Sequence, residues 1–200
     1  DAYEIELFVD AFTGLRQGEL LGLTWDCVDF EHQTLLNNKQ HNRAKGEKEF
    51  HFSSLKTEKV RSLTVTDEVM DALRRQQRRQ AAWKAAAGEL WSNPDNLVFT
   101  TELGRYVNNK TLYMNFKRVM RSLGLSELRF HDLRHTFAVN SLKAGDDIKT
   151  VQENLGHATA SFTLSTYAHA TPGMKRESAN RMGQYLRRIR ESTETQKSTV

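Results

Sequence analysis

The sequence contains one cysteine, two prolines and no long hydrophobic run. A chain whose single cysteine is Cys27 cannot form an internal disulfide, which fits a reducing compartment, and we expect this side chain to be a small buried hydrophobe. No apolar segment approaches the roughly 18 residues that indicate a membrane-spanning helix, and no signal peptide opens the chain. These absences exclude a disulfide-stabilised scaffold and argue against a protein built around membrane-spanning helices.

Basic residues are scarce at the start of the chain, and acidic residues are scarce in its middle. Residues 1–31 hold eight acidic residues but one basic residue, Arg16, for a net charge of −7. Residues 74–121 hold ten basic and three acidic residues, for a net charge of +7. A chain polarised in this way could present one cationic face to a polyanion such as nucleic acid. Because Arg-rich helices are usually only solvated, charge alone favours nucleic acid weakly.

The hydrophobic pattern predicts a mostly helical α+β fold with one small antiparallel sheet in the first third of the chain. Between residues 25 and 65, short β-prone pieces alternate with polar turns, and the basic segment 39–48 is expected to be a hairpin tip. Residues 97–99 are expected to form another short strand. Helices are expected at 3–12, 16–23, 66–87, 108–123, 131–144, 148–155, 161–168 and 173–190.

The first expected helix carries an apolar stripe, which predicts its buried face. Apolar residues at spacing i, i+3, i+4 and i+7 form this stripe, and the acidic residues are expected to point elsewhere. The stripe consists of Ile5, Phe8, Val9 and Phe12, and the acidic residues are Glu4, Glu6 and Asp10. The chain begins inside this helix without a cap or a methionine, so we expect a fragment of a longer protein. Residues 1–190 are expected to form its domain, and the polar residues 191–200 a disordered tail.

The stretch H-D-L-R-H at residues 131–135 can be interpreted in two ways. Histidines at i and i+4 share one helix face, so His131 and His135 could hold zinc, as in the H-E-x-x-H motif of metalloproteases. Alternatively, His131 and Arg134, at i and i+3, could hold a phosphate. The zinc interpretation is the weaker one, because Asp132 stands where that motif has glutamate and Arg134 would place a cation between two ligands of a dication.

Four further stretches complete a pattern. They are T-G-L-R-Q-G-E-L (13–20), L-K-T-E-K-V-R-S-L-T-V (55–65), L-G-H (155–157) and S-T-Y-A-H-A (165–170). Together with H-D-L-R-H-T-F-A, and in this order over about 155 residues, they resemble the motif boxes of the tyrosine recombinase (phage integrase) family. The long segment 33–54 resembles most the integrases of temperate phages and conjugative transposons.

The resemblance implies a catalytic domain that cleaves and rejoins DNA through a 3′-phosphotyrosyl intermediate, for integration and excision of a mobile element. The implied catalytic residues are Arg16, Lys56, His131, Arg134, His157 and Tyr167, with Glu19 and His135 in support. Within the lysine box, Lys59 is the alternative to Lys56. No metal and no cofactor are implied.

The chemistry of phosphoryl transfer supports these assignments independently. Fixed cations stabilise the extra negative charge of a pentacoordinate phosphorus, and arginine suits this task because its planar fork donates two hydrogen bonds to phosphate. Tyr167 would attack phosphorus, and a phenol with an ordinary pKa near about 10 needs a base, for which His131 is the candidate. The leaving 5′-oxygen needs a proton, which the resemblance assigns to Lys56.

Three other functions remain possible at this point. A type IB topoisomerase shares the phosphotyrosine chemistry but relaxes DNA without a partner site. A DNA-binding module that has lost catalysis is a second alternative, although all six catalytic residues are present. A zinc hydrolase is the third and the most remote.

The resemblance also implies partners. Double-stranded DNA is the expected substrate, bound by a homotetramer, and the helix at 173–190 is expected to dock on a neighbouring subunit. Accessory DNA-bending or excision proteins are possible partners, whereas a membrane is not. The expected location is the cytoplasm of a bacterial cell, in association with the nucleoid.

Overall fold

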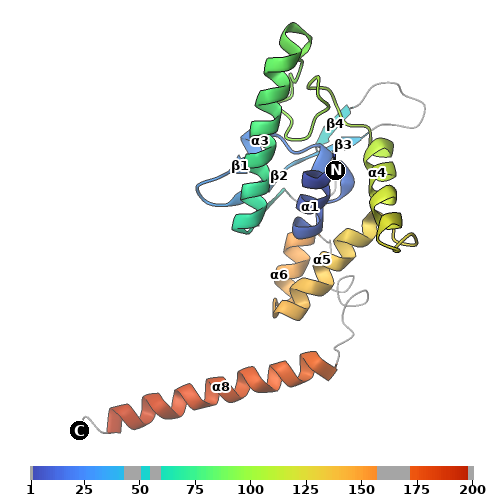
Figure 1. Ribbon diagram of the computed structural model, residues 1–200. Coiled ribbons are helices and arrows are strands. Elements are labelled where there is room, and N and C mark those ends of the chain that lie inside the picture. Colours follow the sequence, from blue (N-terminus) through green and yellow to red (C-terminus); the bar gives the residue numbers. More distant parts are fainter. Residues whose placement is uncertain (1, 43–50, 55–59, 157–171, 198–200) are drawn as a thin grey trace. The chain divides into compact units, whose positions relative to one another are not determined.

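The computed structural model describes residues 2–42, 51–54, 60–156 and 172–197 (Figure 1). The chain divides into two compact units, Asp1–Thr163 and Leu164–Val200. None of the helices in the described ranges combines the length and the apolar composition needed to cross a membrane. The helix expected at 161–168 lies outside the described residues.

The helices of the first unit follow the predicted ranges closely. They are α1 (Glu4–Thr13), α2 (Gln17–Leu21), α3 (Asp67–Ala87), α4 (Asn109–Ser122), α5 (His131–Ala144) and α6 (Ile148–Leu155), with short 3-10 turns at η1 (Trp25–Cys27) and η2 (Gly88–Leu90). The side chain of Asn108 caps α4, and that of Asp147 caps α6 by accepting from two backbone N–H groups. Gly145 and Gly156 end α5 and α6 in the left-handed conformation that favours glycine.

Helix α1 is buried on a different face from the one predicted. Ile5 and Val9 are buried as expected, but Phe12 is 54% exposed and Phe8 only half-buried. Glu6 and Asp10 are buried instead, so the prediction that they point away from the core is wrong. The reason is that α1 packs against both α3 and α5, which covers two sides of the helix and not one stripe.

Within the described residues, the β-structure forms two small antiparallel sheets where one was predicted. In the first, β1 (Val28–Asp29), β2 (Thr34–Asn37) and β5 (Arg61–Thr64) pair in the order β1-β2-β5. The second pairs β3 (Lys39–Asn42) with β4 (His51–Ser54), so residues 39–42 belong to a strand and not to the hairpin tip. Residues 43–50 of the expected tip lie outside the described residues.

The core of the first unit gathers the apolar faces of α1, α2, α3, α4 and the first sheet. Leu20, Leu21 and Leu23 of the second helical segment are buried, and Cys27 is buried as predicted. Residues 97–99 are buried too, but they form only an isolated bridge from Thr24 to Leu97 and no strand. This packing brings residues 14–16, the end of α6 and the start of α5 together.

The opposite charges predicted for the chain partly neutralise each other within the fold. On α1, Glu6 pairs with Arg79 of α3, with 2.9 Å between Oε1 and Nη2, and Glu4 lies 4.0 Å from Arg75. The acidic first helix therefore covers part of the basic helix. Basic side chains remain exposed on α4, which carries Lys110, Arg118 and Arg121.

The second unit contains α8 (Pro172–Lys197), which continues beyond the predicted end at residue 190. The prediction of a disordered tail is therefore wrong for residues 191–197. These residues include glutamate, glutamine and lysine, which are good helix formers, and no proline or glycine interrupts them. Along α8, the apolar side chains of Met182, Tyr185, Leu186 and Ile189 are exposed.

Candidate active site

Arg16 is held at the start of α2 by its own capping interactions. Its backbone N–H donates to Glu19 Oε2 at 2.9 Å, and its Nη1 donates to Glu19 Oε1 at 2.8 Å. The preceding turn requires Gly14, whose φ is +62° and whose added Cβ would lie 2.6 Å from Cδ1 of Phe137 on α5. The T-G-L-R sequence thus ends α1, lets α5 approach closely and fixes Arg16 through Glu19.

Arg134 lies on α5 and is only 1% exposed, so its side chain lies inside the protein. Its Nη1 donates to the carbonyl oxygen of Gly14 at 2.7 Å, and its Nη2 donates to that of Leu155 at the end of α6. At least two of its five N–H groups are therefore committed to backbone from two separate elements. These bonds fix the plane of the guanidinium beside the turn that carries Arg16.

His131 begins α5 and lies on the same helix face as Arg134. Partial burial lowers the pKa of its imidazole, and the positive charges of His135, Arg134 and Arg16 lower this pKa further. The lowered pKa favours the neutral imidazole, which is able to accept a proton. His135 lies one turn along, with its ring edge-to-face against that of His131 and 4.7 Å between centroids.

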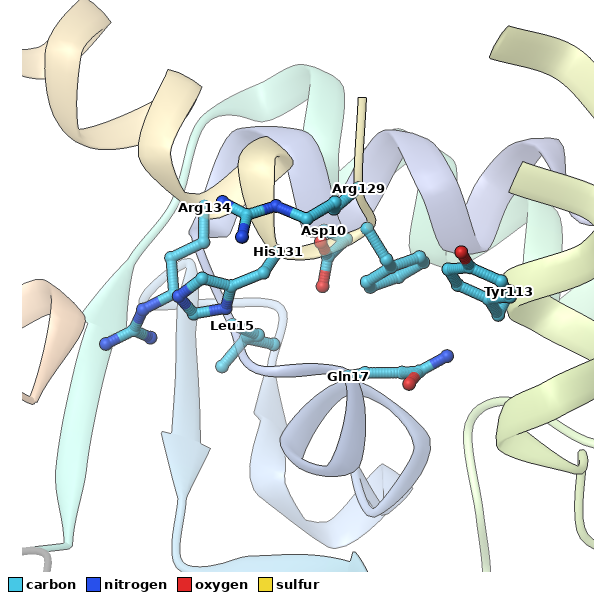
Figure 2. Close-up of a pocket in the computed structure, with 8 residues that line it drawn as sticks. Asp10, Leu15, Gln17, Tyr113, Arg129, His131 and Arg134 are labelled. Carbon is cyan, nitrogen blue, oxygen red and sulfur yellow. The ribbon is translucent and has the colours of Figure 1, made fainter. Parts of the chain in front are cut away.

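A pocket of about 360 Å³ opens beside these residues (Figure 2). It is lined by Asp10, Leu15, Gln17, Tyr113, Arg129, Phe130, His131 and Arg134. The pocket joins α1, the start of α2, α4 and the start of α5 in one cavity.

Asp10 is the unusual member of this pocket. Figure 2 shows its carboxylate pointing into the space that Gln17, His131 and Tyr113 line. The residue is 1% exposed, and neither carboxylate oxygen has a hydrogen-bond partner among the described residues. Burial raises the pKa of this carboxyl well above its ordinary value; the charge of Arg134 opposes the rise, and Glu19 adds to it. The carboxyl thus destabilises the fold when it is ionised.

Replacing Asp10 by asparagine is expected to raise the free energy of unfolding at pH 7 by about 1–3 kcal/mol, because the amide cannot ionise and each unit by which burial raises the pKa of a carboxyl corresponds to about 1.4 kcal/mol. Because the folded state raises the pKa of Asp10, its carboxyl stabilises the fold most below the ordinary value of 3.8, and this contribution is lost as pH rises. The difference between Asp10→Asn and wild type should therefore grow from pH 4 to pH 7.

Urea unfolding at several pH values measures this difference. Asp146→Asn, which removes an exposed carboxylate after the end of α5, is the matched control and should change stability by less than about 0.5 kcal/mol. A constant difference across this pH range would contradict the assignment of Asp10 as a carboxyl that favours the neutral form.

Arg61 is a member of the site that the sequence did not reveal. It begins β5, and its side chain is 7% exposed. Its Nη2 donates to Glu19 Oε2 at 2.7 Å and its Nε to the carbonyl oxygen of Asn154 at 2.9 Å. Burial alone would raise the pKa of Glu19, but hydrogen bonding and charge from Arg61, with help from Arg16, lower it to about 2. Glu19 is therefore a permanent anion among the arginines.

The structure brings together five of the eight predicted site residues: Arg16, Glu19, His131, Arg134 and His135. Lys56, His157 and Tyr167, as well as Lys59, lie outside the described residues. These three assignments remain predictions.

The side chains near His131 are arranged for an anion. Asp132, which would replace the glutamate of a zinc protease, pairs with Arg129 at 2.9 Å. Among the described residues, no three histidine, cysteine or acidic side chains gather in a way that could hold a metal ion. The groups near His131 are Arg16, Arg134 and His135, which suit an oxyanion such as phosphate.

Comparison with known proteins defines the class. The profile of the Phage integrase family matches residues 5–174, and the chain belongs to this family. A tyrosine recombinase XerC-like protein of Caldanaerobacter subterraneus subsp. tengcongensis is 34% identical over 180 residues, covering 84% of this chain and 46% of that protein. The ICEBs1 integrase of Bacillus subtilis is 26% identical over 183 residues, covering 87% of this chain and 46% of that protein.

A solved structure confirms the fold. The Tn1549 transposon integrase in complex with a circular intermediate DNA superimposes with a TM-score of 0.72 and 25% identity, covering 90% of this chain and 58% of that one. The predicted tyrosine recombinase catalytic fold is therefore confirmed. The chain spans about half the length of the curated relatives it matches, for example 46% of the first and 44% of a XerC of Roseiflexus.

Proposed function

We propose that this chain is the catalytic domain, over residues 1–190, of a site-specific DNA recombinase that integrates and excises a mobile element. The observation that supports this most is the buried guanidinium of Arg134, held by backbone carbonyls beside Arg16 and His131. Such a fixed cation costs no reorganisation when charge develops on phosphorus. The family membership and the integrase relatives point to the same reaction.

Each residue would have one role in this reaction. Arg16 and Arg134 would bind the non-bridging oxygens of the scissile phosphate, with His157 as a third donor. Tyr167 would attack phosphorus and become linked to the 3′ end. His131 would take the phenol proton, which its lowered pKa allows, and Lys56 would protonate the departing 5′-oxygen.

Double-stranded DNA is the proposed substrate, and the bacterial nucleoid is the proposed location. The exposed basic side chains of α4 lie on a helix that also lines the pocket through Tyr113, so they could contact the DNA backbone around the scissile phosphate. The Tn1549 integrase was solved with DNA, which supports this proposal by likeness. Accessory DNA-bending or excision proteins would complete the assembly.

A covalent capture experiment tests the proposal. The full-length protein is incubated in EDTA with nicked suicide duplexes whose central sequence is randomised, and adducts that resist SDS are recovered and sequenced. We expect an adduct, because the cations of the site are side chains and need no metal. An adduct that forms only after divalent metal is restored, or none with any sequence, would refute the proposed function.

We also propose that α8 docks on a neighbouring subunit in a tetramer on DNA. Its exposed apolar residues Met182, Leu186 and Ile189 form a stripe at helical spacing, which a second copy would cover. Deleting residues 173–200 is expected to weaken multimer formation on DNA at least tenfold. Analytical ultracentrifugation with bound DNA measures this, with Arg188→Ala on the same helix as the control. Unchanged multimer formation after the deletion would contradict this proposal.

A further inference from the structure

A closed path of hydrogen bonds joins Arg16 to Arg134, and Arg61 is its centre. From Arg16, the path runs through Glu19 to Arg61, whose Nη1 and Nη2 donate to Glu19 Oε1 and Oε2 at 3.2 and 2.7 Å. From Arg61 Nε it continues to the carbonyl of Asn154. The next carbonyl along, that of Leu155, accepts from Arg134, which also donates to Gly14 and so returns to the turn before Arg16.

The end of α6 is held by two arginines at once. Helix carbonyls at a C-terminus have no partner within the helix and carry partial negative charge, so cations there are favourable. Arg61 takes the carbonyl of Asn154 and Arg134 takes that of Leu155. At Gly156, an added Cβ would lie 2.7 Å from Nη1 of Arg61, so the guanidinium rests directly on the backbone that leads into His157.

We propose that Arg61 is a positioning residue, which fixes the relative placement of Arg16 and Arg134 without touching the phosphate itself. This proposal rests on the proposed function, and it identifies the residue that holds the phosphate-binding arginines in place. Arg61 connects the turn and start of α2, strand β5 and the end of α6, three elements that the chain brings together from distant positions. The residue separations of its bonds are 42 to Glu19 and 93 to Asn154.

Arginine suits this role in a way that lysine does not. Its planar fork binds both oxygens of Glu19 while Nε, in the same plane, binds a third acceptor. An ammonium keeps the charge but cannot fix three acceptors in one plane. Arg61→Lys should therefore preserve part of the ion pair with Glu19. It should lose the hydrogen-bond geometry that fixes Arg16 relative to Arg134.

The Arg79–Glu6 pair provides a matched control. It is also an arginine–glutamate pair with a buried carboxylate, and it also joins two distant elements, α1 and α3. Within the part of the chain that the structure describes, Arg79 donates to Glu6 and to the carbonyl oxygen of Ala2, and neither residue belongs to the site. Arg79→Lys should thus lower stability as Arg61→Lys does, without altering the phosphate site.

The first test uses inorganic phosphate as the probe and needs no DNA. The Nε–Hε signals of Arg16 and Arg134 are followed by NMR in this chain during a phosphate titration, and thermal unfolding is measured in parallel. In Arg61→Lys we expect phosphate affinity about tenfold lower, whereas Arg79→Lys should stay within twofold of wild type. If the two variants lose equal stability and both keep wild-type phosphate affinity, Arg61 is only structural and the proposal is overturned.

The second test measures the reaction. At saturating DNA, the rate constant of covalent adduct formation in Arg61→Lys should fall about 10- to 100-fold, because small misplacements of catalytic groups cost this much. The DNA dissociation constant should stay within twofold. Failure of the wild-type protein to form any adduct would refute the proposed function alone, since the phosphate titration still decides the role of Arg61. A weaker DNA affinity with an unchanged rate constant would overturn the positioning role.

Discussion

Substituting Tyr167 by phenylalanine is expected to abolish the covalent protein–DNA adduct, with a loss of at least about 10⁴-fold in rate, because the substitution removes the hydroxyl of the proposed nucleophile. The phosphate site described above would remain intact, since Arg16, His131 and Arg134 all come from other segments of the chain. Noncovalent DNA binding should therefore persist within about twofold. Gel analysis of SDS-resistant adducts measures the loss, and a filter-binding titration measures the affinity.

Tyr185→Phe is the control for this substitution. It removes an exposed tyrosine hydroxyl from α8 and should leave adduct formation unchanged. An adduct of normal yield in Tyr167→Phe would show that another residue is the nucleophile. In that case, peptide mapping of the adduct would identify the residue.

Substituting Arg134 by lysine is expected to lower the cleavage rate about 10²- to 10³-fold, the usual effect of removing one preorganised donor from a site that stabilises developing charge. Lysine keeps the positive charge but cannot bind the carbonyls of Gly14 and Leu155 and face a phosphate at the same time. Single-turnover kinetics on a suicide substrate measures the effect at saturating protein.

Arg129→Lys is the matched control for Arg134→Lys. Arg129 lines the same pocket, but its side chain is 72% exposed and pairs with Asp132 on the surface. Its rate should fall by less than about threefold, since exposed ion pairs contribute little. Thermal unfolding of both variants separates a folding defect from a catalytic one. Equal rates for Arg134→Lys and wild type would contradict the assigned role.

Much of the helical framework could be predicted from the sequence, because its boundaries depend on local residues. Asn108 and Asp147 cap helices, and Gly145 and Gly156 end them, through interactions within a few residues. The motifs that contain Arg16, His131 and Arg134 were likewise predictable, because they resemble the motif boxes of the phage integrase family. The end of α8 was not, because a polar composition is compatible with both a helix and a tail.

The errors concern contacts between distant segments. The apolar stripe along one face of α1 could not show that the helix is covered on two sides, so the burial of Glu6 and Asp10 was missed. Arg61 was overlooked because its partners lie 42 and 93 residues away. A signal did exist, since Arg61 and Leu63 share one face of β5 and both are buried, while Ser62 and Thr64 are exposed. A charged residue on the buried face of a strand indicates a partner.

The two backbone bonds of Arg134 also determine when in folding the site can exist. They close loops of 120 residues, to Gly14, and 21 residues, to Leu155, and the longer one forms only after α1 and α5 have met. A nascent or partly unfolded chain therefore holds the nucleophile and the cations as unconnected segments. Such a chain lacks the assembled cations of the phosphate site, so the proposed recombinase would become able to cleave DNA only after these long-range contacts have formed.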